Sequence, residues 1–265
     1  MPFLDLKNAN YYYETHGSGS TTFVLTHCLL WNSFMFKDLV EYYKNKYKVI
    51  IFDFPGHGKS VSKTGKYDME TLTEDTIEII ETLTDTNVIL LGVAMGGNVC
   101  LRVAARMPEK VEKMFILGTS IMEETPEDKL RFKMLNNLAR TVGFWPVEKN
   151  IMDMMFGKTF LENKERKADY DYFLKKLREN DRFSIVKATE GLIMREPIPE
   201  DLKKITCKTL VIAGDEDKTS PIAISQELAD DLAHGELVVL EKTGLSGILE
   251  SPDKYIHEID MFLEA

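Results

Sequence analysis

The stretch from Asn87 to Gly97, NVILLGVAMGG, constrains the fold of this chain more than any other part of the sequence. The run that ends at Leu91 is short and apolar, which is typical of an interior strand in a parallel sheet covered on both faces. From Asn98 to Arg106 the chain carries good helix formers, and Pro108 ends that run. Three glycines crowd the junction between the two parts. The stretch therefore predicts a buried strand that turns abruptly into a helix.

Two of these glycines, Gly92 and Gly96, flank the apex of the turn, each two positions away from it. This is the spacing of G-x-S-x-G, the nucleophile elbow, in which a sharp turn between strand and helix holds a reactive side chain above a sheet. The residue at the apex is Ala94, which has no lone pair with which to attack a substrate. The sequence thus predicts the backbone of an elbow without its nucleophile.

Four motifs that each accompany a predicted strand follow one another along the chain: Phe23–Leu30 (FVLTHCLL), Val49–Ser60 (VIIFDFPGHGKS), Asn87–Gly97 and Thr209–Asp217 (TLVIAGDED). In these motifs and their order the chain resembles the α/β-hydrolase superfamily, in particular its small esterases, lactonases and C–C hydrolases, over nearly its whole length. The resemblance implies an α/β-hydrolase fold, with a mostly parallel, doubly wound sheet and ligands bound beyond the carboxyl ends of the strands.

Predicted strands and helices alternate along most of the chain. Strands are expected at 3–7, 11–14, 22–26, 47–53, 87–91, 111–117, 209–214 and 236–240, and helices at 34–44, 69–83, 98–106, 221–232 and 252–263. The alternation stops between residues 120 and 205, which are helical in pattern and rich in methionine and aromatic residues. The resemblance implies a helical cap there. We therefore expect a core of residues 1–119 and 206–265 with a cap of residues 120–205 inserted in it.

The apolar residues of the expected cap serve two purposes. Leu130, Met134 and Leu138 recur at helical spacing, and we expect them to pack in the interior of the cap. The cap must also present an underside to the pocket, and flexible thioethers and aromatic rings suit an apolar cavity. The expected pocket residues are His27, Cys28, Phe144, Trp145, Met152 and Met155.

Acyl transfer on this scaffold requires a nucleophile, a base that accepts its proton, and a carboxylate that orients the base. The resemblance assigns the carboxylate to Asp217, which lies at the family's G-x-x-D spacing, in preference to Asp215. The family's base follows a glycine after the last strand, and that position holds Leu245 here. Ala94 occupies the nucleophile position. Two members of the expected triad are therefore substituted in this sequence.

The other part of the expected site is the oxyanion hole, which needs two backbone N–H groups. The resemblance assigns these to Leu29 and Met95, and any residue except proline can supply an N–H. Cys28 replaces the glycine that the family usually has after the histidine at position 27. His57 is interpreted as a structural part of its loop rather than as a base.

Composition limits the expected partners and location. A formal net charge of −10 argues against binding to nucleic acid or to an anionic membrane, because both are negatively charged. The first residues lack the pattern of a signal peptide and no apolar run is long enough to span a bilayer, so we expect a soluble, cytoplasmic protein. The three cysteines and five histidines show no disulfide or metal-binding pattern, and we expect neither a metal nor a cofactor.

Three functions remain open from the sequence. The first is a protein derived from a serine carboxylic ester hydrolase, disabled or repurposed because Ala94 and Leu245 replace the nucleophile and the base. The second is a non-hydrolytic enzyme, such as a lyase or cyclase, that uses Cys28, His27 or Asp217 in the same pocket. The third is a binding protein or sensor that holds a small apolar molecule. Haloalkane dehalogenase and epoxide hydrolase mechanisms need an aspartate at the apex, so Ala94 excludes both.

Overall fold

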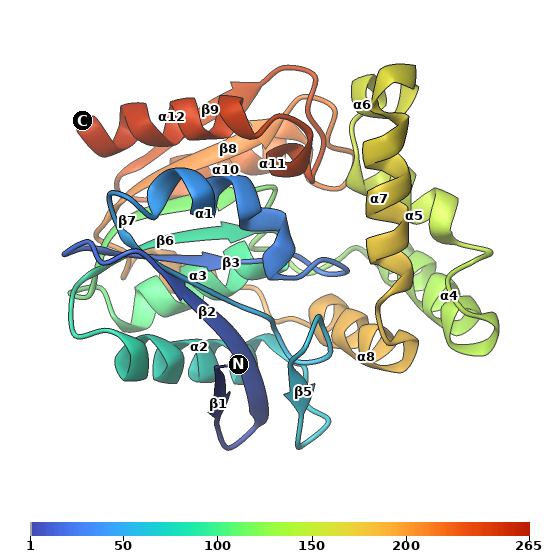
Figure 1. The fold of residues 1–265 in the computed structure, drawn as a ribbon, viewed down its shortest axis with the longest axis horizontal. Coiled ribbons are helices and arrows are strands. Elements are labelled where there is room, and N and C mark those ends of the chain that lie inside the picture. Colours follow the sequence, from blue (N-terminus) through green and yellow to red (C-terminus); the bar gives the residue numbers. More distant parts are fainter. Residues whose placement is uncertain (1) are drawn as a thin grey trace.

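The computed structural model of the chain describes residues 2–265 and places nine strands in one sheet. These strands are β1 (Phe3–Asp5), β2 (Ala9–His16), β3 (Thr22–Thr26), β4 (Lys48–Phe52), β5 (Val61–Ser62), β6 (Val88–Val93), β7 (Val111–Leu117), β8 (Lys208–Gly214) and β9 (Gly235–Leu240). Their order across the sheet is β1-β2-β4-β3-β6-β7-β8-β9, with β5 beside β2 (Figure 1). The strands from β4 across to β9 are parallel, whereas β1, β2 and β5 pair antiparallel. The carboxyl ends of the parallel strands therefore meet at one edge.

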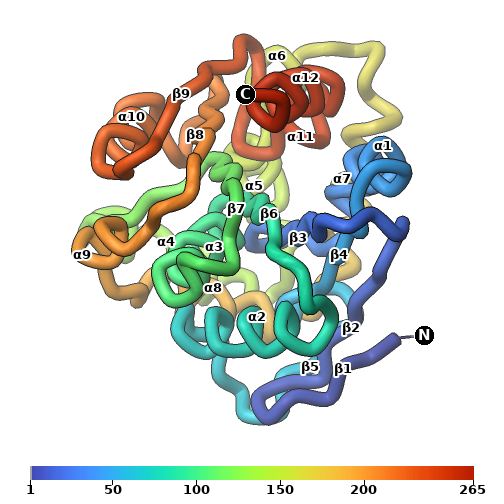
Figure 2. Tube along the Cα trace, turned by 90° about the vertical axis from the view of Figure 1, so that its left-hand side faces the viewer, coloured from blue at the N-terminus to red at the C-terminus, as the bar shows by residue number. Residues whose placement is uncertain are grey.

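Helices cover both faces of the sheet, because successive residues of a strand point to opposite sides. Phe23 and Leu25 of β3 are buried in one cluster with α1 (Lys37–Tyr43) and α12 (Pro252–Glu264). Val24, between them, is buried in a second cluster with α2 (Met69–Leu83), α3 (Met95–Arg106) and α10 (Ile222–Asp231). Figure 2 shows the two helical layers on either side of the strands. The doubly wound α/β fold expected from the sequence is confirmed.

The structure also contains short elements that the sequence pattern does not indicate. Besides β5, these are α11 (Gly247–Glu250), directly after the expected base position, and the 3-10 helix η1 (Ser33–Phe36), where one continuous helix was expected up to residue 44. Elements of two to four residues are too short to show a hydrophobic period.

The segment between β7 and β8 is largely helical. Its elements are α4 (Pro126–Val142), α5 (Glu148–Met155), α6 (Lys158–Glu162), η2 (Lys164–Arg166), α7 (Lys167–Arg178), α8 (Arg182–Ile193) and α9 (Pro199–Leu202). Figure 1 shows α4 to α8 gathered at one end of the molecule, beyond the carboxyl ends of the parallel strands. We call residues 120–205 the cap segment, and its separation from the core at these boundaries stays a prediction.

The apolar residues of α4 do not lie where the sequence pattern placed them. Leu130, Met134 and Leu138 are 61%, 65% and 40% exposed, so the expectation that they pack inside the cap is wrong. The buried residues of α4 are Asn136 and Ala139, and the amide of Asn136 donates to the carbonyl O of Val186 in α8. Helical periodicity defines an apolar face, but only the neighbouring elements decide whether that face is covered.

Candidate active site

The turn between β6 and α3 has the backbone of a nucleophile elbow. Ala94 adopts φ 48° and ψ −106°, a strained conformation for a residue with a side chain. Its N–H donates to the carbonyl O of Leu117 at 2.8 Å, and its own carbonyl O accepts from the N–H of Asn98 at 3.0 Å. A Cβ on Gly96 would overlap the carbonyl O of Thr26, so glycine is required there for the close approach of α3 to β3. The turn is therefore held tightly although its apex carries only a methyl group.

The expected acid and base positions converge beside this turn. Gly118 directly follows β7, whose last residue accepts the hydrogen bond from Ala94. A Cβ built on Gly118 would lie 2.5 Å from Cδ1 of Leu245 and 3.0 Å from Oδ2 of Asp217. Ala94 and Leu245 also pack, both partly buried, against the same apolar cluster. The structure thus brings the three expected triad positions together at the carboxyl edge of the sheet.

Asp217 is buried and held by its own loop. Its Oδ1 accepts hydrogen bonds from the N–H of Thr219 at 2.7 Å, the hydroxyl of Thr219 at 2.8 Å and the N–H of Ser220 at 3.1 Å. Burial raises the pKa of Asp217, and these three hydrogen bonds oppose that rise. Loop donors therefore stabilise the carboxylate from one side, while Oδ2 lies on the side of Leu245.

The two neighbouring acids have other partners. Asp215 Oδ1 accepts from the N–H of Lys242 at 2.6 Å. Glu216 accepts from the N–H and from the hydroxyl of Thr159 in α6, both at 2.6 Å, and so joins the core to the cap segment. Of the three acids, Asp217 is the one whose carboxylate lies beside Leu245 at Gly118.

The expected oxyanion donors lie at the ends of two adjacent elements. Met95 is the first residue of α3, and the N–H groups of the first helical turn have no intrahelical acceptor. Leu29 lies in the loop after β3, directly before Leu30, whose φ is 74°. β3 and β6 are hydrogen-bonded neighbours, so the residues that follow them start from the same edge of the sheet.

An apolar cavity of about 60 Å³ lies between this edge and the cap segment. Leu29 and Leu30 form its wall on the core side, and Phe144 and Met155 are among the residues that line it from the cap segment. The predictions that Met152 and Trp145 line the pocket are wrong. Met152 is fully buried in the apolar cluster, and Trp145 is 78% exposed.

His27 and Cys28 are buried but do not line this cavity. The ring of His27 is turned toward the loop after β4, where its Nε2 accepts from the N–H of Phe54 at 2.8 Å, and its Nδ1 is 2.8 Å from the carbonyl O of Cys28. Burial lowers the pKa of His27 to about 4 and raises the pKa of the Cys28 thiol. Both ring nitrogens of His27 are engaged, and burial together with the Asp217 carboxylate raises the pKa of the Cys28 thiol, so neither residue is set up for proton transfer or nucleophilic attack.

Sequence reasoning missed the polar contacts that join the site to the cap segment. Glu250, buried in α11, accepts through Oε1 from the N–H of Gly157 and the N–H of Gly244, both at 3.1 Å. Burial raises its pKa to about 7. The N–H of Ser246, next to the base position, donates to the carbonyl O of Met155 at 2.7 Å. The motif Leu-Glu-x-Pro that contains Glu250 was the available signal, but spacing alone does not show that this acid is buried.

A groove of about 570 Å³ lies between β2, α1 and the end of α7, and neither Ala94 nor Leu245 lines it. Two of its lysines form ion pairs with glutamates that also line it, Lys44 with Glu41 and Lys176 with Glu179, each at 2.7 Å. We interpret it as a solvated surface groove. Within residues 2–265, no cluster of metal-ligating side chains occurs, and no helix is both long and apolar enough for a membrane span.

Comparison with known proteins assigns the family. The profile described as alpha/beta hydrolase fold matches residues 21–252. The 3-oxoadipate enol-lactonase 2 of Acinetobacter baylyi is 25% identical over 256 residues, which cover 95% of this chain and 92% of that protein. The solved enol-lactonase from Burkholderia xenovorans has a TM-score of 0.91 at 22% identity and covers 100% of both chains. A thermophilic esterase from Thermogutta terrifontis has a TM-score of 0.90 at 19% identity, covering 100% of this chain and 98% of the other. The chain belongs to the α/β-hydrolase fold family.

Proposed function

We propose that this protein derives from a serine carboxylic ester hydrolase and is disabled for, or repurposed from, triad hydrolysis because Ala94 and Leu245 occupy the nucleophile and base positions. The observation that carries the proposal is Ala94 itself, held at φ 48° on an otherwise complete elbow. Strain of this kind persists where the surrounding structure enforces it, and in hydrolytic relatives of this fold it serves to present a nucleophile. Here it presents a methyl group.

The rest of the site supports binding without triad turnover. The N–H groups of Leu29 and Met95 are available in principle to bind a carbonyl oxygen, because backbone donors do not depend on the side chain. Oδ1 of Asp217 accepts hydrogen bonds from Thr219 and Ser220, so this carboxylate is held in place without a histidine. We therefore infer a ligand with a carbonyl group and an apolar body, of the size of a small ester or lactone.

The cavity implies that the cap segment moves when such a ligand enters. Its volume of about 60 Å³ is well below the roughly 300–1,000 Å³ of typical ligand sites. α4, α5 and α8 contribute most of its lining, so a shift of these helices away from Leu29 and Leu30 would enlarge it. We expect the ligand to bind between these helices and the carboxyl edge of the sheet.

The test is the variant Ala94→Ser with Leu245→His. The two substitutions return a hydroxyl to the elbow and an imidazole beside Asp217, and we expect hydrolysis of a short-chain nitrophenyl ester to rise at least about 100-fold over the parent chain. Each single substitution should add little, because triad members act as a unit. A fluorophosphonate probe should label Ser at position 94 in the double variant alone, as seen by peptide mass spectrometry.

The controls distinguish an incorrect proposal from a double variant that does not fold. The double variant must first match the parent in circular dichroism and in its elution as a folded species. A folded double variant that gains neither esterase activity nor phosphonate labelling would contradict the assignment of positions 94 and 245.

The ligand-binding part of the proposal has its own measurement. Native mass spectrometry of the purified parent chain, followed by release under denaturing conditions, should detect a small apolar carbonyl compound or, after soaking, a bound short-chain ester that remains intact. Turnover of that ester by the parent would instead support catalysis by groups other than positions 94 and 245. A Cys28→Ser variant with unchanged turnover would then exclude the thiol.

A further inference from the structure

Two carboxyl groups of the core hold the same short part of the cap segment. Oε1 of Glu250 accepts from the N–H of Gly157, directly before α6, and from the N–H of Gly244, in the loop after β9. Glu216, in the loop after β8, accepts from the N–H and the hydroxyl of Thr159 in α6. The start of α6 is therefore joined to two loops of the core that also carry the expected acid and base positions.

The two carboxyl groups are also neighbours of each other. Oε2 of Glu216 and Oε2 of Glu250 lie 2.7 Å and 3.1 Å from the point that a Cβ on Gly157 would occupy. Like charges on carboxyl groups this close repel each other, and the negative form of at least one of them is disfavoured. We call Glu216 and Glu250 the acid pair.

Glu250 is the member of the acid pair that is poorly placed to carry a charge. It is 4% exposed, and its Oε2 has no hydrogen-bond partner among residues 2–265. Burial, with a further contribution from the charge of Glu216, raises its pKa to about 7. An ionised carboxylate that is buried and incompletely hydrogen-bonded is costly, whereas the protonated form leaves no charge uncompensated.

Glu216, by contrast, remains ionised. Its burial is outweighed by the hydrogen bonds from Thr159 and by the charges of Lys158 and Lys218, which together hold its pKa below the usual value. Both lysines belong to the elements beside it, α6 and the loop after β8. Glu216 therefore presents a fixed negative charge to Glu250.

The other ionisable groups around Glu250 do not cancel that charge. Arg166 of η2 lowers the pKa of Glu250, but its Nη1 donates to the backbone carbonyl O of that residue, at 2.8 Å, and not to its carboxyl group. Tyr255 of α12 is buried, and burial raises its pKa, so it is neutral. Ionisation of Glu250 thus adds a second negative charge beside the first, without a cation on its carboxyl group.

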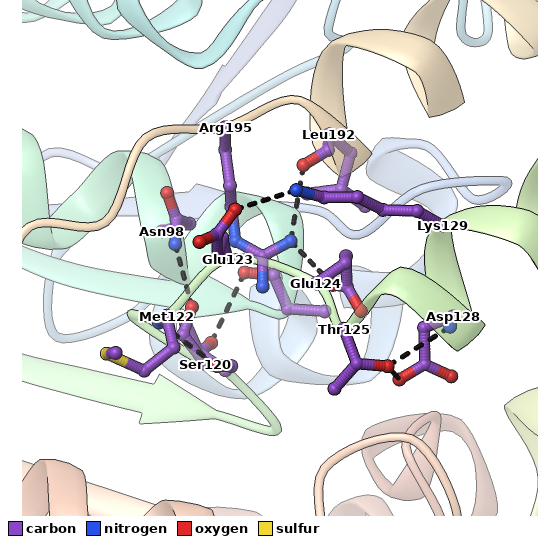
Figure 3. Close-up of polar contacts among 12 residues, drawn as sticks. Asn98, Ser120, Met122, Glu123, Glu124, Thr125, Asp128, Lys129, Leu192 and Arg195 are labelled. Atoms are coloured by element: carbon purple, nitrogen blue, oxygen red, sulfur yellow. Dashed lines mark hydrogen bonds and ion pairs between the residues drawn. The ribbon is translucent and has the colours of Figure 1, made fainter.

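The cap segment is fixed on its other side by different groups (Figure 3). Arg195, which follows α8, donates through Nη1 to Oε1 of Glu124 at 2.6 Å, and Asn98 Nδ2 of α3 donates to the carbonyl O of Ser120 at 2.9 Å. A guanidinium stays protonated and an amide does not ionise in the range where Glu250 titrates. Figure 1 shows α6 and α8 on opposite sides of the cap segment. Only one of these two sides is therefore sensitive to pH near neutrality.

We propose that the acid pair is a pH-sensitive latch, which holds residues 155–159 closed against the core while Glu250 is protonated and releases them when Glu250 ionises. Met155 belongs both to this segment and to the lining of the apolar cavity, as do other residues of α5. Release would let α5 move away from the core wall of the cavity, while the side fixed by Arg195 stays in place. The role of the latch in ligand entry rests on the function proposed above, whereas the latch itself does not.

Hydrogen exchange of the parent chain, measured by mass spectrometry from pH 5.5 to 8.5, tests the proposal. With labelling times scaled to the intrinsic exchange rate at each pH, peptides covering 151–159 and 243–247 should lose protection at least tenfold, with a midpoint near pH 7. Peptides covering 120–125 and 195–198 should keep their protection. Glu250→Gln cannot ionise, and all four regions should stay protected in this variant.

Tryptophan fluorescence gives an independent measurement, because Trp31 is buried beside the latch. Its Nε1 donates to Ser246 Oγ at 2.8 Å, and its ring centroid is 6.0 Å from that of Phe156. The chain has two tryptophans, so Trp145→Phe leaves Trp31 as the only one. In that background, quenching by acrylamide should rise at least twofold from pH 5.5 to 8.5, and should stay constant when Glu250→Gln is added.

Two further variants test the parts of the latch. Glu216→Gln removes the neighbouring charge, so the midpoint should move to lower pH. An unmoved midpoint would overturn the pairing of the two acids. Glu124→Gln is the matched control on the other side of the cap segment. It should lower the protection of residues 120–125 without removing the pH step at 151–159.

The remaining outcomes decide for or against the latch as a whole. A parent chain in which 151–159 stays protected up to pH 8.5 overturns it, and so does a pH step that persists in Glu250→Gln. Loss of protection at 120–125 with the same midpoint, or a change in circular dichroism at that pH, overturns it in favour of general unfolding. None of these measurements uses a substrate, so they are independent of whether positions 94 and 245 are correctly assigned.

Discussion

Two amphipathic helices of this protein, α3 and α4, have opposite surroundings. In α3 every residue from Met95 to Ala105 is buried, because the helix lies against the sheet and is covered by α2. In α4, which is longer, only Asn136 and Ala139 are buried, and its main neighbour is α8. The sequences of both helices repeat apolar residues at helical spacing. The difference teaches that periodicity predicts a helix with an apolar face, whereas burial of that face depends on the layers around it.

We expect the largest difference between the two helices when one leucine in each is truncated to alanine and the free energy of unfolding is compared. Leu101 of α3 is fully buried, and Leu101→Ala should lower the free energy of unfolding by about 3 kcal/mol through lost apolar contact and a residual cavity. Leu130 of α4 is 61% exposed, and Leu130→Ala should change it by less than about 0.5 kcal/mol when measured on the monomer. Guanidinium denaturation of the two variants beside the parent measures both. Equal losses would break the comparison.

The second prediction concerns Glu250, a buried acid of the core that contacts the cap segment. Burial raises the pKa of Glu250 to about 7, above the value of 4.5 for an unperturbed glutamate. The folded state therefore retains a proton that the unfolded state releases, and the stability that this proton contributes is complete below pH 4.5 and lost as the pH rises through 7. Glu250→Gln keeps an acceptor for the N–H groups of Gly157 and Gly244 but cannot ionise. It should be more stable than the parent at pH 8 by on the order of 2 kcal/mol.

The measurement is the free energy of unfolding of parent and Glu250→Gln at a series of pH values from 4 to 8. The two curves should converge at the acid end and separate as the pH increases. The matched control is Glu227→Gln, at an exposed position of α10, which should run parallel to the parent. Parallel curves for Glu250→Gln would show that this acid ionises in the folded state as it does in the unfolded chain.

The smallest expected effect concerns the start of α3. Ala94 sits at φ 48°, so Ala94→Gly relieves strain of about 1–3 kcal/mol and loses part of that gain to the greater freedom of glycine in the unfolded chain. We expect a net increase in the free energy of unfolding of about 1 kcal/mol. Ala104→Gly, inside the same helix and at ordinary helical geometry, should lower it by about 1 kcal/mol or more. Thermal unfolding followed by circular dichroism distinguishes the two signs, and a destabilised Ala94→Gly would mean that the elbow is not strained.

Much of the fold was predictable because its signals are local. The strands at Thr22–Thr26 and Val111–Leu117 and the helix at Met69–Leu83 have the bounds that their patterns predicted. The family was predictable for the same reason, since glycines and acids at fixed offsets from strands are visible in the chain. The positions of Ala94, Asp217 and Leu245 were expected from motif order, and the structure places them at one edge of the sheet.

Other features were not predictable, because they depend on residues far apart in the chain. The exposure of Trp145 depends on the direction in which α4 ends, and the engagement of both ring nitrogens of His27 depends on the loop after β4. Glu250 acquires its raised pKa from the closure of α11 over the strand edge and the segment before α6. No spacing in the sequence encodes these contacts.

By itself, the sequence determined the longer elements, their order and the residue types at each motif, including alanine at the apex of the turn after β6, because these follow from residue identity and short-range geometry. Only the tertiary structure decided which apolar faces are covered, which acids are buried and which cap residues reach the cavity, because burial and pKa depend on the layers packed around a residue. The exposure of the apolar residues of α4 and the burial of the Glu250 carboxyl are the clearest examples of features that the tertiary structure decides.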